Sequence, residues 1–333
     1  MPSNDFLTFA GGAGANVLSQ ADYAALAASI GANGFSAGTA QSAQVNKVWR
    51  QASIMSAVLA QLIVDLTGQN AVDDGTTTTL LANLKAAIGS QSAGVVGEAR
   101  NAKMVVAAAS NAATFTADEV VVVTALGGTP FRLGNFSQTV STSATGIGGV
   151  VGGALTANGY AAIYAAYNPT TRAQGAFIVN ANSLVPNVAA SPPAGWIATA
   201  LVSVWPLNSS TQFVPGTQRG RRVGLVTAGG FTVSATQTSY ASVAVSGIPA
   251  NAVRLQGNLS SLSTVSNATI IFSVALDAAG TSVKSNVSTT VVGNNGTSMP
   301  VEIDIFTPQT LYYRMPGSTG TPSMSLVATS YDF

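Results

Sequence analysis

The segment VNKVWRQASIMSAVLAQLIVDL, residues 45–66, carries the longest regular pattern in this chain of 333 residues. Its apolar residues are spaced alternately three and four positions apart. This is the a/d spacing of about three heptads, which puts one apolar stripe on a helix and turns it toward identical helices. We predict a coiled-coil-like helix from near Thr39 to Gly68, with a trimer seam formed by Val45, Val48, Ala52, Met55, Leu59, Leu62 and Leu66.

The stripe is wider than a two-stranded seam needs, because Trp49, Val58 and Ile63 occupy flanking positions. A wide stripe fits three strands, or a helix that packs on its own head as well as on its partners. An ordinary amphipathic helix inside a monomeric bundle would show similar spacing, so spacing alone leaves that alternative open.

The composition limits the chemistry that the chain can carry out. Charged residues make up 8% of the sequence, against roughly 25% in an ordinary globular protein. The surface must therefore be covered by small neutral groups or be buried between subunits. The absence of Cys and His excludes disulfides, Ser-His-Asp and Cys-His catalysis, and the usual zinc sites. We expect no cofactor and no metal.

The charge pattern also bears on partners and location. With a net charge of +1, electrostatics do not favour nucleic acid or membrane partners. Since the first residues, MPSNDFLTFAGGAG, lack the features of a signal peptide, we expect synthesis in the cytoplasm. Residues 146–167 are uncharged and long enough to span a membrane, but six are Gly. We predict a Gly-rich loop followed by a buried strand, and no membrane insertion.

The sequence predicts a modular α+β chain with a helical head in residues 1–90. Ser19 is the expected N-cap of the first helix, with Asp22 at its third position, and Gly31 and Gly34 end it. The sequence Asp73-Asp74-Gly75 is expected to cap a third helix that ends at Gly89.

From about residue 100 the sequence becomes β-rich, with runs broken by Gly, Asn and Pro. We predict a middle β domain in residues 91–225 and a C-terminal β-sandwich in residues 226–333. The runs of the middle domain are 119–126, 160–167, 175–181 and 198–207; those of the last are 231–248, 252–261, 268–277, 283–292, 299–306, 310–316 and 323–333.

Two regions of the chain resemble tail fibre proteins of tailed bacteriophages. NDFLTFAGGAGANVLSQADYAAL (4–26) and GFSAGTAQSAQVNKVWRQASIMSAVLAQLI (34–63) are similar to the N-terminal attachment region of these proteins. ALGGTPFRL (125–133), AAIYAAYNPTT (161–171) and PAGWIATALVSVWPLNSSTQF (193–213) are similar to a domain that is common in the same proteins. The residues after about 230 match no family that we can name.

This resemblance implies a homotrimeric fibre of the virion tail. Its N-terminal end would attach to tail or baseplate proteins. Its outer domains would bind a receptor on the bacterial surface, which could be a glycan, a pilus or an outer-membrane protein. The alternative is an adaptor that joins the baseplate to another fibre and contacts no receptor; such a protein would need no terminal domain of its own.

A surface-polysaccharide depolymerase is the enzymatic alternative, and it would need two carboxylates roughly 5–10 Å apart. No Asp or Glu lies between Glu119 and Asp277, so the middle domain cannot supply them. Glu302 and Asp304 alternate on one strand and therefore share a face. We interpret them as the solvated face of a half-buried strand and expect no catalytic residues and no enzyme activity.

Arg219, Arg221 and Arg222 lie in the stretch GTQRGRRVG (216–224), at the predicted domain junction. One interpretation gives them anionic partners such as lipopolysaccharide phosphates, which guanidinium groups bind as planar forks. The other is a solvated interdomain linker whose arginines donate to carbonyls of a neighbouring chain.

Aromatic residues suit receptor contacts because they offer large rigid surfaces. In the terminal block we select Tyr240, Tyr312, Tyr313 and Arg314 as receptor-binding candidates, with Tyr331 as a further aromatic residue. Since Tyr312 and Tyr313 are adjacent on a predicted strand, only one of them can face the core.

Overall fold

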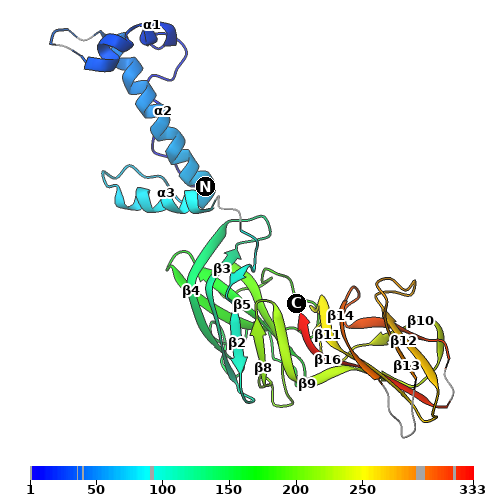
Figure 1. The fold of residues 1–333 in the computed structure, drawn as a ribbon. Helices are drawn as coiled ribbons and strands as arrows, with labels where there is room; N and C mark the ends of the chain where they lie inside the picture. The colour runs from blue at the N-terminus through cyan, green and yellow to red at the C-terminus, as the bar shows by residue number, and fades with distance from the viewer. Residues whose placement is uncertain (1, 36, 40, 91–93, 290–296, 318–319) are drawn as a thin grey trace. The chain divides into compact units, whose positions relative to one another are not determined.

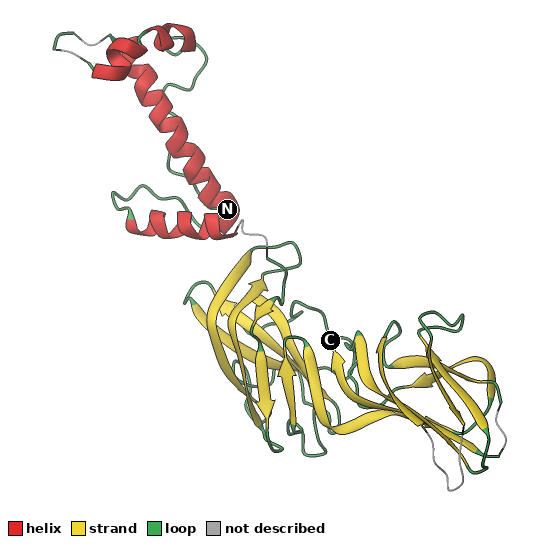
Figure 2. Cartoon of the chain, in the orientation of Figure 1, coloured by secondary structure: helices red, strands yellow, loops and turns green. Residues whose placement is uncertain are grey.

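The computed structural model describes residues 2–35, 37–39, 41–90, 94–289, 297–317 and 320–333. By its internal contacts the chain forms two compact units, Met1–Ala93 and Gly94–Phe333. The helices belong to the first unit and most of the second is strand, so the β-rich α+β class is confirmed (Figures 1 and 2). No helix in the described ranges is long and apolar enough to cross a membrane.

The first unit holds α1 (Gln20–Ala25), the π-helical turn η1 (Ala27–Gly31), α2 (Ser42–Thr67) and α3 (Thr78–Ser90) (Figure 1). Ser19 caps α1 as predicted, because its Oγ accepts the Asp22 N–H at 3.1 Å. Gly68 ends α2 in the left-handed region, at φ 65°, which confirms that boundary. The helix begins at Ser42 instead of near Thr39.

The predicted caps of the third helix were wrong. Asp74 Oδ1 accepts the backbone N–H of Thr76 at 2.8 Å and so stabilises a turn before the helix. The helix itself begins at Thr78. The backbone carbonyl of the preceding residue, Thr77, accepts the N–H of Leu81. Gly89 does not end the helix, which continues to Ser90.

An extended segment before α1 runs antiparallel to α2, and the sequence analysis did not foresee it. Asn4 Nδ2 donates to the Ala57 carbonyl at 3.2 Å, and the Phe9 N–H donates to Ser53 Oγ at 2.9 Å. Farther along, Leu18 N–H donates to the Ala43 carbonyl at 3.2 Å. This segment therefore covers one side of α2 along most of its length.

The second unit consists of sixteen strands in the described residues. In chain order they are β1 (Ala99–Arg100), β2 (Lys103–Val106), β3 (Ala112–Val123), β4 (Pro130–Ser141), β5 (Tyr160–Asn168), β6 (Ala173–Asn180), β7 (Ala198–Pro206), β8 (Gly216–Arg219), β9 (Arg222–Val233), β10 (Gln237–Ala244), β11 (Arg254–Ser263), β12 (Thr269–Ala275), β13 (Lys284–Thr289), β14 (Thr297–Asp304), β15 (Thr310–Met315) and β16 (Pro322–Asp332). The predicted strand 283–292 ends at Thr289, and its last three residues lie outside the described ranges.

Twelve strands form one hydrogen-bonded sheet in the order β14-β11-β16-β9-β8-β2-β3-β7-β5-β6, with β1 and β4 also paired to β3. A second sheet has the order β10-β15-β12-β13. The two sheets pack on each other through buried residues such as Leu259 of β11 and Phe272 of β12. Phe231 and Phe272 meet edge to face across this core, with ring centroids 6.3 Å apart.

Strand β9 belongs to both halves of the second unit. Residues 222–225 pair with β8 on one side, and residues 222–224 pair with the end of β16 on the other. Residues 229–233 pair with the first half of β16. The predicted domain boundary at residue 225 therefore lies inside a continuous strand.

The middle strands enclose a core of large aromatic residues. Tyr164 and Phe177 stack at 5.5 Å between centroids, and Trp205 Nε1 donates to the Val214 carbonyl at 2.9 Å. Residues 146–167 form turns followed by the buried strand β5, which confirms the prediction of a loop and a strand.

Candidate functional site

The first candidate site is the apolar stripe of α2. Met55, Leu59 and Leu62 are 60%, 44% and 37% exposed, although they are the centre of the predicted seam. Ala52 is exposed as well, and Val45, Val48 and Leu66 are half-buried. The single chain leaves most of the seven side chains uncovered.

The unit packs on itself along one flank of the stripe and on the far side of α2. Ala60 and Ile63 are buried, and the extended N-terminal segment contacts Ala57 and Ser53. Ile63, predicted at a flank of the seam, is 1% exposed inside its own unit, as expected for a helix that packs on its own head. Trp49 and Val58, the other two flanking residues, are exposed, and Phe9 meets the Trp49 ring edge to face at 5.6 Å.

The second candidate site is the outer face of the sheet β10-β15-β12-β13. Along β15, the buried residues Leu311, Tyr313 and Met315 alternate with Tyr312 and Arg314. Tyr313 is 6% exposed, so of the adjacent pair it is Tyr313 that faces the core, and Tyr312 that faces outward. Tyr313 is thereby removed from the residues that could touch a partner.

Tyr240 comes from the neighbouring strand β10, and its ring lies against Gly280, where an added Cβ would be 2.5 Å from a ring carbon. Arg314 Nε donates to the Thr238 carbonyl of β10 at 3.1 Å. On β12, which pairs with β15, and on β13 beyond it, the exposed residues Ile271 and Val287 are direct cross-strand partners. The fold therefore brings Tyr312, Arg314 and Tyr240 to neighbouring strands of one sheet.

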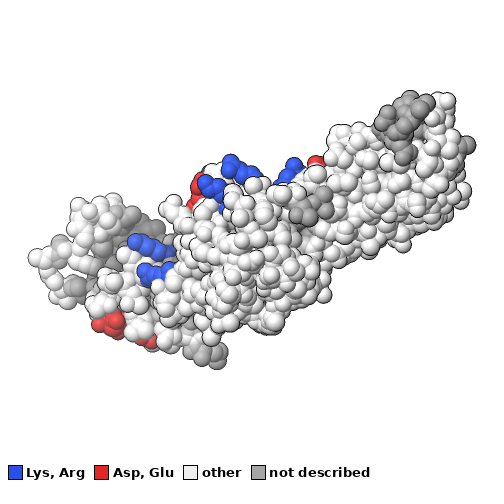
Figure 3. Space-filling model, turned by 90° about the horizontal axis from the view of Figure 1, so that it is seen from below, with Lys and Arg blue, Asp and Glu red and all other residues white. Residues whose placement is uncertain are grey.

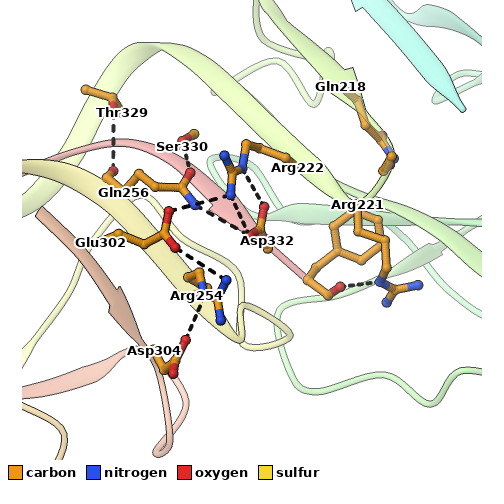
Figure 4. A network of polar contacts seen from close by, with 12 residues as sticks. Gln218, Arg221, Arg222, Arg254, Gln256, Glu302, Asp304, Thr329, Ser330 and Asp332 are labelled. Atoms are coloured by element: carbon orange, nitrogen blue, oxygen red, sulfur yellow. Dashed lines mark hydrogen bonds and ion pairs between the residues drawn. The ribbon is translucent and has the colours of Figure 1, made fainter. Parts of the chain in front are cut away.

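The third candidate site is a cluster of charged residues at the ends of β9, β11, β14 and β16 (Figure 4). Arg222 binds Asp332 as a fork, with Nε to Oδ1 at 2.8 Å and Nη2 to Oδ2 at 3.1 Å. Arg254 Nε donates to Asp304 Oδ1 at 2.7 Å. Glu302 lies between the two arginines, 3.3 Å from Arg254 Nη1 and 3.7 Å from Arg222 Nη2.

The Arg222 fork, together with the weaker hydrogen bond from Gln256, holds the pKa of Asp332 below its ordinary value. Glu302 and Asp304 are both exposed, which confirms the prediction of a solvated strand face. Asp332 was not among the predicted site residues, because its partner Arg222 is 110 residues away along the chain.

The segment GTQRGRRVG is a β-hairpin and not a solvated linker, so that interpretation was wrong. Strands β8 and β9 pair directly, and Gly220, at φ 59°, makes the turn. The carbonyls that Arg221 reaches belong to its own chain: Nε donates to Phe333 O, and Nη1 lies 3.5 Å from Leu201 O. The guanidinium also stacks on the Phe333 ring, 4.4 Å from its centroid.

A cavity of about 870 Å³ opens beside this cluster. It is lined by Arg219, Arg221, Arg222, Val253, Arg254, Asp304, Asp332 and Phe333. Elsewhere on the face drawn in Figure 3, charged residues occupy only small parts of a largely neutral surface.

Comparison with known proteins does not assign the chain to a family. No family model matches the chain, and no curated protein matches it. Among solved structures it is similar to the Gx strain of infectious bursal disease virus, at 10% identity and a TM-score of 0.18, over 71% of this chain and 67% of that one. A VP2 protein of the same virus gives the same identity and TM-score, over 72% and 71%. Scores this low support no conclusion about fold or function.

Proposed function

We propose that this protein is a structural, non-enzymatic component of a tailed phage or of a phage-derived tail-like particle. It assembles as a homotrimeric fibre, attaches to tail or baseplate proteins through its helical unit, and binds a receptor on the bacterial surface through its C-terminal strands.

The observation that carries this proposal is the exposed apolar stripe of α2. A monomeric bundle would bury Met55, Leu59 and Leu62 against its own helices, but here the chain covers one flank of the stripe and the far side of α2. Exposed apolar side chains at a/d spacing lose contact with water when identical helices pack in register. The resemblance of residues 4–63 to phage attachment regions supports the same assembly.

The receptor part of the proposal rests on the outer face of the four-stranded sheet. Tyr312 and Arg314 project from it without filling the core, and Ile271 and Val287 add exposed apolar surface beside them. Tyrosine and arginine are enriched where protein surfaces make strong contacts. An adaptor without receptor contact would leave this face without a role.

Two measurements test the proposal. The mass of the full chain in solution should be three times that of one protomer. The fragment Gly94–Phe333, which is a compact unit by its own contacts, should bind cells of a susceptible bacterial strain and not a receptor-deficient mutant. If the protein is trimeric but binds no strain to which the parent particle adsorbs, the adaptor function is favoured. A monomeric full chain would contradict the proposal of a trimeric fibre.

A further inference from the structure

The chain has few charges, and it concentrates them at the cavity beside β9. The structure places Arg219, Arg221, Arg222 and Arg254 around it, together with Asp304 and Asp332, while Glu302 stays outside the lining. Four guanidinium groups therefore face two carboxylates. Glu302 adds a third carboxylate from beside the lining, because it pairs with both Arg222 and Arg254, so the cluster keeps an excess of one positive charge.

Stability accounts for only part of this concentration, through the bidentate pair of Arg222 with Asp332, whose side chain is 21% exposed. The side chains of Arg222, Arg254, Glu302 and Asp304 are all 43% exposed or more. Ion pairs this exposed to solvent contribute little to the free energy of unfolding, since water screens the attraction and ordering the side chains costs entropy.

The hydrogen-bond partners show which donors remain available. Arg222 and Arg254 are held in place by Asp332, Asp304 and Glu302, and Arg221 is held by Phe333. The Arg219 backbone pairs with β2 and β9, but among the described residues its side chain has no hydrogen bond or ion pair. Its guanidinium, with five N–H donors, is thus free to bind a ligand beside a pre-positioned set of cations.

We propose that this cavity binds the anionic group of a sugar, either a carboxylate or a phosphate. Guanidinium forks match the geometry of both groups. Val253, which is 55% exposed, offers an apolar wall for the sugar ring next to them. A role of the cavity in host recognition rests on the proposed function, whereas anion binding does not.

The test uses the full chain and calorimetric titration with glucuronate, glucose 6-phosphate, inorganic phosphate and neutral glucose. The two charged sugars distinguish carboxylate from phosphate as the recognised group. We expect at least one of them to bind, glucose not to bind, and affinity to fall as salt is raised. Arg219→Gln should weaken binding about tenfold, the loss of one charge-assisted hydrogen bond.

Two further variants make the test specific. Arg132→Gln, on β4, removes an exposed arginine that does not line the cavity and should bind like the wild type. Asp304→Asn removes a negative charge from the lining and should strengthen binding, an effect that a purely structural role would not produce.

Equal binding of glucose and glucuronate, or equal losses for Arg219→Gln and Arg132→Gln, would overturn the proposal, as would no binding of any anion at millimolar concentration. If the protein binds glucuronate but no bacterial cells, the anion site is supported and the proposed receptor-binding function is contradicted.

Discussion

The Tyr331 hydroxyl, close to the C-terminal end of β16, donates a hydrogen bond of 2.6 Å to the backbone carbonyl of Val204 in β7. The side chain is fully buried, and its bond joins the last strand of the chain to the middle strands. Phe333 N–H, two residues later, donates to the Arg221 carbonyl at 3.3 Å. The two halves of the second unit are therefore connected by side chains as well as by the shared sheet.

We predict that Tyr331→Phe lowers the free energy of unfolding of Gly94–Phe333 by about 1–3 kcal/mol, because the Val204 carbonyl loses its side-chain donor in a dry site. Urea unfolding measures the change. Tyr312→Phe, at an outward-facing position, is the matched control and should change little. Equal effects of the two substitutions would show that the buried hydrogen bond is not important for stability.

Alkaline pH should unfold the second unit. Burial raises the pKa of Tyr160 to about 12, and it raises the pKa values of Tyr164 and Tyr331 as well. Above about pH 10 the unfolded chain loses these protons while the folded chain keeps them, so stability falls as pH rises from there through the folded pKa values. Phenolate absorbance should rise together with loss of structure. Titration of every tyrosine near pH 10 in a chain that remains folded would contradict this prediction.

Leu59→Glu tests the α2 stripe. In a parallel trimer the substitution brings three like charges into one dry layer, and each unpaired ion costs several kcal/mol. We expect the wild-type fragment Met1–Ala93 to be a trimer and the Leu59→Glu fragment to be a monomer. Light scattering measures the mass of both. Ala86→Glu adds the same charge at an exposed position of α3 and should leave the trimer intact.

A folded wild-type fragment that stays monomeric at high concentration would show that the seam does not trimerise alone. In that case the mass of the full chain, with and without Leu59→Glu, decides whether the helix contributes to assembly.

Substitutions on β15 should separate binding from folding. Tyr312→Ala and Arg314→Ala are expected to reduce attachment of Gly94–Phe333 to susceptible cells while its melting temperature stays nearly the same. Tyr313→Ala removes a buried side chain and should cost about 3–5 kcal/mol of stability, the range for large aromatic residues in a core. If the Tyr312 and Arg314 variants bind cells as well as the wild type does, the receptor site is not on this face of the sheet.

The prediction of α2 succeeded because its determining residues are close in sequence, although the equally local caps predicted for α3 were wrong. The heptad spacing of residues 45–66 and the left-handed Gly68 act within a few residues, so α2 and its C-terminal end could be predicted. The extended segment from Asn4 to Phe9 could not, because its hydrogen bonds reach residues more than forty positions away. A pattern that repeats within one helix carries no information about such a segment.

The β part shows the same limit. Strand β4 was missed because PFRLGNFSQTVS contains Pro, Gly and several polar residues, and it becomes a strand by pairing with β3. The hairpin β8–β9 was missed because its three arginines suggested a solvated linker. Alternation along β15 predicted that one of Tyr312 and Tyr313 faces inward, but choosing between them required the core of the folded unit.

The continuity of β9 has a mechanical consequence. A force that pulls the C-terminal strands away from the middle strands crosses residue 225 within a strand and not through a loop. It reaches β8 and β16 through hydrogen bonds that run perpendicular to β9. The register with β16 shifts between Gly224 and Gly229, so a load along β9 strains the bonds of each paired segment together, as shear. Strands arranged in this way transmit tension with little extension.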